Sequence, residues 1–159
     1  MRSEEEANRA VEQYADMVRR ICFLQLKNYA DVEDIFQTVF LKYVLYSGTF
    51  ESDAHEKAWF IRVTINACKD LLKSFFHQKT VPLDIITEAA VAEQVDRELL
   101  TAVLSLQKKY KDVIYLHYFE GYSAVEIARI LGGNENTIYS RISRARKLLK
   151  KQLGGEELE

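Results

Sequence analysis

Apolar side chains recur every three or four residues along most of the chain, which is the period of an amphipathic helix. One apolar stripe covers residues 7–21 and a second covers residues 32–44, ending before Ser47 and Gly48. A third and longer helix is expected over residues 55–77. Because runs of alternating apolar and polar residues are absent, the sequence predicts an all-α fold.

The start of the second helix carries its own signal. Asp31 has the short acceptor side chain that favours an N-cap, and Glu33 and Asp34 follow where the helix dipole favours acids. We therefore predict that Asp31 caps this helix.

Residues 78–95 interrupt the helical pattern. They include Pro82, the only proline of the chain, and show no sustained apolar stripe. This composition favours two small helical domains, residues 1–77 and 96–159, joined by a flexible linker. The alternative is one domain, with a loop and a short helix over residues 86–95 packed against it.

Helical periodicity resumes at Asp96, with one apolar face over residues 99–110 and a second helix over residues 111–119. Ser123 and Glu126 then have the spacing of a capping box, which opens a short helix. Two glycines allow a tight turn, and a second cap opens a longer helix with one apolar face. The two glycines are Gly132 and Gly133, and the cap is Asn134. The apolar face consists of Ile138, Ile142, Ala145 and Leu149.

A helix-turn-helix that reads duplex DNA consists of a short helix, a tight turn and a longer helix, and this segment has all three parts. The opposite face of the longer helix is polar, with asparagine and arginine that suit base edges and cations that suit phosphates. The alternative is a solvated basic helix at the end of a bundle. The predicted DNA-contacting residues are Asn136, Thr137, Tyr139, Ser140, Arg141, Ser143, Arg144, Arg146 and Lys147.

The net charge of −2 over 159 residues hides an asymmetry. Residues 1–59 carry 11 acids against 7 bases, whereas residues 96–151 carry 6 acids against 11 bases. The C-terminal half therefore suits a phosphate backbone. With two distant cysteines, three scattered histidines and no long apolar run, we expect buried free thiols, no metal, no cofactor, no membrane segment and a cytoplasmic location.

Two stretches carry a family resemblance. The run from Gly121 through Glu126 to Ala128, followed by Asn134 to Arg146, closely resembles the last conserved region of bacterial sigma factors of the extracytoplasmic-function group. The resemblance implies that the longer helix reads the −35 promoter element. Upstream, Asp31-x-Glu33-Asp34-Ile35-x-Gln37-x-x-Phe40 and Ala58-Trp59-Phe60-x-Arg62-Val63-x-x-Asn66 are similar to the stretches that dock on polymerase and hold the −10 element.

The resemblance implies an RNA polymerase specificity subunit, whose partners are core RNA polymerase and promoter DNA and whose further candidate partner is an anti-sigma factor. The resemblance also implies that Asp31, Asp34 and Gln37 contact core RNA polymerase. The −10 residues would be Trp59, Arg62, Asn66, Lys69 and Lys73, although Trp59 also suits a core position.

Two other function classes explain less of the sequence. A free-standing helix-turn-helix regulator would bind a palindromic site as a dimer, and it leaves the pattern of residues 31–73 unexplained. An enzyme needs convergent titratable groups, and the sequence has no nucleophile–base pair or phosphate-binding glycine loop. We expect neither an enzyme nor a small-molecule substrate.

Overall fold

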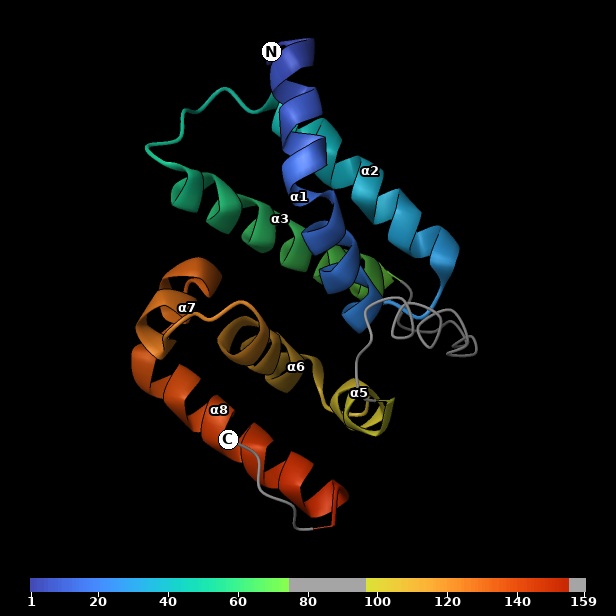
Figure 1. Ribbon diagram of the computed structural model, residues 1–159, viewed down its shortest axis with the longest axis vertical. Helices are drawn as coiled ribbons and strands as arrows, with labels where there is room; N and C mark the ends of the chain where they lie inside the picture. The colour runs from blue at the N-terminus through green and yellow to red at the C-terminus, as the bar shows by residue number, and fades with distance from the viewer. Residues whose placement is uncertain (75–96, 155–159) are drawn as a thin grey trace. The chain divides into compact units, whose positions relative to one another are not determined.

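The computed structural model describes residues 1–74 and 97–154, and all regular elements in these ranges are helices (Figure 1). The predicted all-α fold is therefore confirmed for this part of the chain. The chain divides into two compact units, Met1–Ile86 and Thr87–Glu159. The predicted linker, residues 78–95, and the predicted end of the third helix, residues 75–77, lie outside the described residues.

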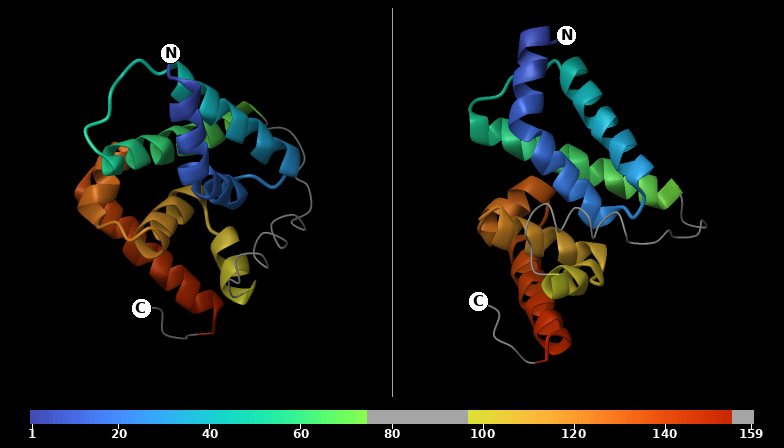
Figure 2. Two further views of the ribbon diagram at one scale, coloured as in Figure 1. Left: turned by 45° about the horizontal axis from the view of Figure 1, so that its top comes forward. Right: turned by 45° about the vertical axis from the view of Figure 1, so that its right-hand side comes forward.

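The first unit is built from α1 (Glu4–Gln25), α2 (Tyr29–Leu45) and α3 (Asp53–Ser74), each of which packs against the other two (Figures 1 and 2). Apolar side chains of all three helices are fully buried between them, which removes their surface from water and stabilises the unit. The largest of these buried side chains are Ile21, Leu26, Tyr43, Phe60 and Ile61.

The cap of α2 differs from the prediction. Asn28, not Asp31, is the N-cap, because its Oδ1 accepts hydrogen bonds from the amides of Ala30 at 2.7 Å and Asp31 at 3.2 Å. Asp31 lies inside the first turn, where its negative charge still favours the helix N-terminus. Both side chains can cap a helix, and the extended backbone at Asn28 decides between them.

The second unit contains α5 (Arg97–Leu104), α6 (Lys108–Ile114), a single wider π-type turn η1 (Tyr115–Phe119), α7 (Ala124–Leu131) and α8 (Glu135–Gln152). Helix α8 packs against α5, α6 and α7 (Figure 1). One cluster of this core joins side chains of α5, α6 and α8. Its buried members are Ala102, Leu106, Tyr110, Ile114, Ala145 and Leu149.

The helical pattern predicted over residues 99–110 is interrupted. Helix α5 ends at Leu104, and the hydroxyl of Ser105 donates to the carbonyl of Ala102 at 2.7 Å. A serine that bonds back to the preceding turn competes with helix continuation. Helix α6 then starts at Lys108, three residues earlier than predicted, and Phe119 ends the π-type turn rather than an α-helix.

The predicted helix-turn-helix is present. Ser123 Oγ accepts from the amide of Glu126 at 3.2 Å, and the Glu126 carboxylate accepts from the amide of Ser123 at 2.8 Å, so the capping box is confirmed. Gly132 ends α7 in the left-handed conformation at φ 76°, which favours glycine. Asn134 Oδ1 accepts from the amides of Asn136 and Thr137 and so caps α8, as predicted.

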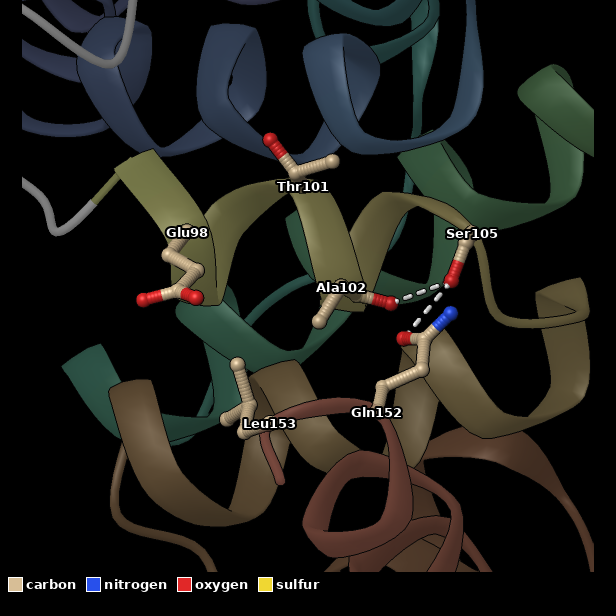
Figure 3. A pocket seen from close by; sticks show the side chains of 6 residues that line it. All are labelled: Glu98, Thr101, Ala102, Ser105, Gln152 and Leu153. Carbon is tan, nitrogen blue, oxygen red and sulfur yellow. Dashed lines mark hydrogen bonds between the residues drawn. The ribbon is translucent and has the colours of Figure 1, made fainter. Parts of the chain in front are cut away.

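A small hollow lies beside the end of α8 in the second unit, with a volume of about 420 Å³ (Figure 3). Ser105 Oγ donates to Gln152 Oε1 at 3.1 Å across it. The hollow lies at the C-terminal end of α8, away from the first turns that carry the predicted base contacts. It is lined by Glu98, Thr101, Ala102, Ser105, Gln152 and Leu153.

Candidate nucleic-acid and polymerase interfaces

Helix α8 has one buried and one exposed face. Ile138, Ile142, Ala145 and Leu149 are buried, as their spacing predicts. Of the predicted DNA-contacting side chains, only Arg141 is half-buried. The exposed ones are Asn136, Thr137, Tyr139, Ser140, Ser143, Arg144, Arg146 and Lys147.

Charge is unevenly distributed along this exposed face. The first turns of α8 carry neutral hydrogen-bonding groups and one acid, Glu135, whereas every cation of the helix lies from Arg141 onward. A helix of this kind can offer neutral groups to base edges at its N-terminal end and cations to phosphates further along. The cations are Arg141, Arg144, Arg146, Lys147, Lys150 and Lys151.

Helix α3 carries the second polar stripe. Arg62, Asn66, Lys69 and Lys73 are all exposed, at the spacing that places them on one face. The opposite face enters the core of the first unit through Phe60, Ile61, Thr64, Ile65, Ala67 and Cys68. The structure thus brings three cations and one amide of the predicted −10 residues together on one surface of α3.

Trp59 is half-buried and belongs to an aromatic cluster at the start of α3. Its ring centroid lies 5.2 Å from that of Tyr46, 5.9 Å from that of Phe50 and 5.1 Å from that of Phe60. Phe60 is completely buried and is therefore a core residue of the first unit. Trp59 is therefore only partly buried, in contrast to its neighbour Phe60.

A buried carboxylate lies beneath this cluster, and the sequence analysis missed it. Glu56 is 4% exposed and accepts hydrogen bonds from Tyr43 Oη at 2.7 Å, Arg9 at 2.9 Å and Tyr14 Oη at 3.1 Å. Burial opposes ionisation of Glu56, but the bonds from Arg9, Tyr43 and Tyr14 outweigh it and lower its pKa. Burial, and then the charge of Glu56, raise the pKa of Tyr14.

Arg2 connects the N-terminus to the loop between α2 and α3, residues 46–52. Its guanidinium donates to the carbonyls of Tyr43 at 3.1 Å and Gly48 at 2.7 Å, and lies 5.0 Å from the centre of the Phe50 ring. Gly48 packs under Tyr46, where an added Cβ would lie 2.5 Å from ring atoms. No sequence signal links Arg2 to this loop, because the contacts span more than 40 residues.

The predicted polymerase-docking residues lie on α2. Asp34 and Gln37 are exposed, while Asp31 is half-buried. Burial, and then the charge of Asp34, raise the pKa of Asp31 above its ordinary value. Leu41 and Leu45, at 59% and 60% exposure, continue the exposed side of α2 beyond Gln37. This helix therefore presents carboxylate, amide and aliphatic groups together.

Comparison with known proteins finds a family match in each half of the chain. Residues 10–75 match the family described as sigma-70 region 2, and residues 96–149 match the family described as sigma-70, region 4. The polar faces of α3 and α8 fall within these two matches respectively. A free-standing helix-turn-helix regulator would not account for the first match.

Relatives align over most of the chain. RNA polymerase sigma factor SigV of Bacillus subtilis is 30% identical over 145 residues, covering 87% of this chain and 86% of the relative. ECF RNA polymerase sigma factor SigM of Mycobacterium tuberculosis is 31% identical over 140 residues, covering 86% of this chain and 71% of the relative.

Two solved structures share the fold. The sigma factor RpoE in complex with the anti-sigma factor NepR from Bartonella quintana has a TM-score of 0.72 at 19% identity, covering 96% of this chain and 99% of that chain. CnrH in complex with the cytosolic domain of CnrY has a TM-score of 0.71 at 21% identity, covering 98% of this chain and 92% of that chain. From the two matched regions and these relatives, we conclude that the chain belongs to the sigma-70 family of RNA polymerase sigma factors, in the extracytoplasmic-function group.

Proposed function

We propose that the chain directs promoter-specific initiation through three surfaces: α8 on the −35 element, α3 on the −10 element and α2 on core RNA polymerase. The observation that carries this proposal is that each unit has an exposed polar helix face, on α3 and on α8, backed by a buried apolar face. Nucleotide transfer would belong to core polymerase, and the chain would act in the cytoplasm, where polymerase and chromosome meet.

On α8, Asn136 suits a bidentate contact to adenine and Arg144 a bidentate contact to guanine. Thr137, Ser140 and Ser143 can bond several base edges, and the exposed ring of Tyr139 can pack against them. Phosphates would be held by Arg141, Arg146 and Lys147, together with the cations at the end of the helix.

On α3, the stripe of Arg62, Asn66, Lys69 and Lys73 would follow the backbone of a separated strand. Such sites combine a cationic groove with aromatic rings on which bases stack. Trp59 lies at the N-terminal end of this stripe, and its half-buried ring is steadied by its aromatic neighbours. It is the ring of this helix that we assign to base stacking.

On α2, the exposed Asp34 and Gln37 would contact core polymerase. Asp31, which is half-buried, and Leu41, which is exposed, would lie at the edges of the same contact surface. Glu33 is excluded from this set because it pairs with Arg19 of α1, with Nε and Oε2 separated by 3.1 Å. Charged groups in such an interface set orientation and partner choice.

The α3 and α8 surfaces would recognise the two elements of one promoter together. Residues 1–77 and 96–159 are the proposed domains, joined through residues 78–95. Once polymerase holds the chain, binding at one element raises the effective concentration at the other. The solved sigma factor RpoE is bound to an anti-sigma factor, so an anti-sigma protein is a candidate further partner of this chain.

The test is run-off transcription with core RNA polymerase on a pool of promoters randomised at the −35 and −10 elements. We expect transcripts that depend on the chain and share one sequence at each element. Asp34→Ala combined with Gln37→Ala should weaken co-purification with polymerase and reduce the transcripts. The matched control, Glu12→Ala combined with Asp16→Ala, removes two exposed side chains of α1 and should retain both.

Chain-dependent transcripts without any shared sequence would contradict the assignment of α3 and α8. Normal co-purification of the Asp34/Gln37 variant would contradict the assignment of α2.

A further inference from the structure

The two cysteines of the chain, Cys22 and Cys68, meet in the core of the first unit. Cys22 lies on α1 and Cys68 on α3, and their Sγ atoms are 3.9 Å apart. Both are completely buried and neither is in a disulfide. Forty-six positions separate them in sequence, so their contact is a product of tertiary packing.

The contact and its burial hold Cys22 as a thiol. The contact with the Cys68 sulfur, followed by burial, raises the pKa of the Cys22 thiol far above its ordinary value. Buried protonated thiols react slowly with outside reagents, because the thiolate is the nucleophile. Reaction therefore depends on local opening of the α1–α3 contact.

We propose that Cys22 and Cys68 form an oxidation site, at which a thiol oxidant produces an intramolecular disulfide that cross-links α1 to α3. With a diazene oxidant such as diamide, two S–H bonds break and one S–S bond forms. The two electrons and two protons pass to the N=N bond, which becomes a hydrazine.

The geometry favours this product over the alternatives. A disulfide needs sulfurs about 2.05 Å apart, so the two Sγ atoms must approach by less than one atomic diameter. Once one thiol has been activated by the oxidant, the second already lies beside it. Outside thiols, including those of a second copy, must first enter the core, so a mixed or intermolecular disulfide is disfavoured.

The cross-link has a structural consequence. Cys68 lies on the buried side of the same turns of α3 that expose Asn66 and Lys69. A disulfide there would tie α3 to α1 and restrict the unfolded chain by closing a long loop. The oxidised first unit should therefore unfold at a higher temperature than the reduced one. This inference does not rest on the proposed promoter function.

The experiment uses the full chain, purified under reducing conditions and then treated with excess diamide under native conditions. After removal of diamide, the chain is unfolded, alkylated with N-ethylmaleimide and measured by intact mass and non-reducing peptide mapping. We expect a monomer that has lost two hydrogens, accepts no alkyl group and yields a linked peptide pair containing Cys22 and Cys68.

Thermal unfolding is followed in the same samples through the fluorescence of Trp59, the only tryptophan, which lies in the first unit. The midpoint should rise by about 10 °C or more on oxidation and return after reduction with dithiothreitol. Cys22→Ser should show neither the cross-link nor the rise. Cys22→Ala serves the same purpose if a buried hydroxyl prevents folding.

Either of two results would overturn the proposal: both thiols remain open to alkylation after diamide, or the linked sulfurs belong to two chains. A cross-link that leaves the midpoint unchanged would overturn the stabilising role.

Discussion

Replacing Glu56 with glutamine tests whether the buried carboxylate holds the first unit together. The substitution keeps the size of the side chain but removes its charge and one of its two acceptor oxygens. Three donors, from Arg9, Tyr14 and Tyr43, converge on Glu56 at 2.7–3.1 Å. A glutamine at this position cannot accept from all three, and its amide must point toward another donor.

The cost follows from the burial of the partners. Tyr14 and Tyr43 are 3% and 0% exposed, so a hydroxyl that loses its acceptor has no access to water. A buried donor left unsatisfied costs about 1–3 kcal/mol. The Arg9 side chain is 47% exposed, so its ion pair with Glu56 is screened and adds about 1 kcal/mol or less. We expect Glu56→Gln to lower the free energy of unfolding by about 1–4 kcal/mol.

Urea unfolding followed by Trp59 fluorescence measures this quantity in the first unit. Glu12→Gln, on the exposed side of α1, is the control and should stay within about 0.5 kcal/mol of the parent. A Glu56→Gln variant as stable as Glu12→Gln would refute the reasoning.

The pH dependence gives a second test of the same network. Because the folded-state pKa of Glu56 is lowered, its stabilisation is fully present above the unfolded pKa and is lost as pH falls through the folded pKa. The difference in unfolding free energy between the parent and Glu56→Gln should therefore be largest at neutral pH and should shrink in acid. A difference that is constant with pH would show that Glu56 is not ionised in the folded state.

Three further substitutions test other contacts. Ser123→Ala removes the hydroxyl of the α7 capping box and should cost about 1 kcal/mol in urea unfolding of the second unit monitored by circular dichroism, whereas Ser123→Asp should retain most of the stability. Arg144→Ala should cost about 1–3 kcal/mol of promoter affinity and relax one position of the −35 element; an unchanged base preference in randomised-promoter transcription would count against the reading face. Arg2→Ala leaves the Gly48 carbonyl without this donor and should loosen residues 46–52, which would appear as a shifted Trp59 emission and slower promoter opening. An unaltered emission spectrum would contradict the role of Arg2 in holding this loop.

The sequence by itself determined the helix-turn-helix most completely. Its caps at Ser123 and Asn134 and its left-handed turn at Gly132 depend on bonds within a few residues, and the burial of Ile138 follows from helical spacing. The same short-range logic placed Arg62, Asn66, Lys69 and Lys73 on one exposed stripe of α3. The choice of Asn28 over Asp31 as a cap was not determined in this way, because two adequate caps compete and the backbone decides.

Tertiary structure alone decided which side chains meet across helices. Glu56 lies in the first turn of α3, where an acid needs no buried partner, yet it is buried because Arg9, Tyr14 and Tyr43 supply donors from α1 and α2. In the sequence, Cys22 and Cys68 are two distant small residues with no sign of contact. Packing of α1 against α3 brings their sulfurs to 3.9 Å. Periodicity reports which face of a helix is buried. It carries no information on the register between helices, which is set when side chains from distant segments fill one close-packed core.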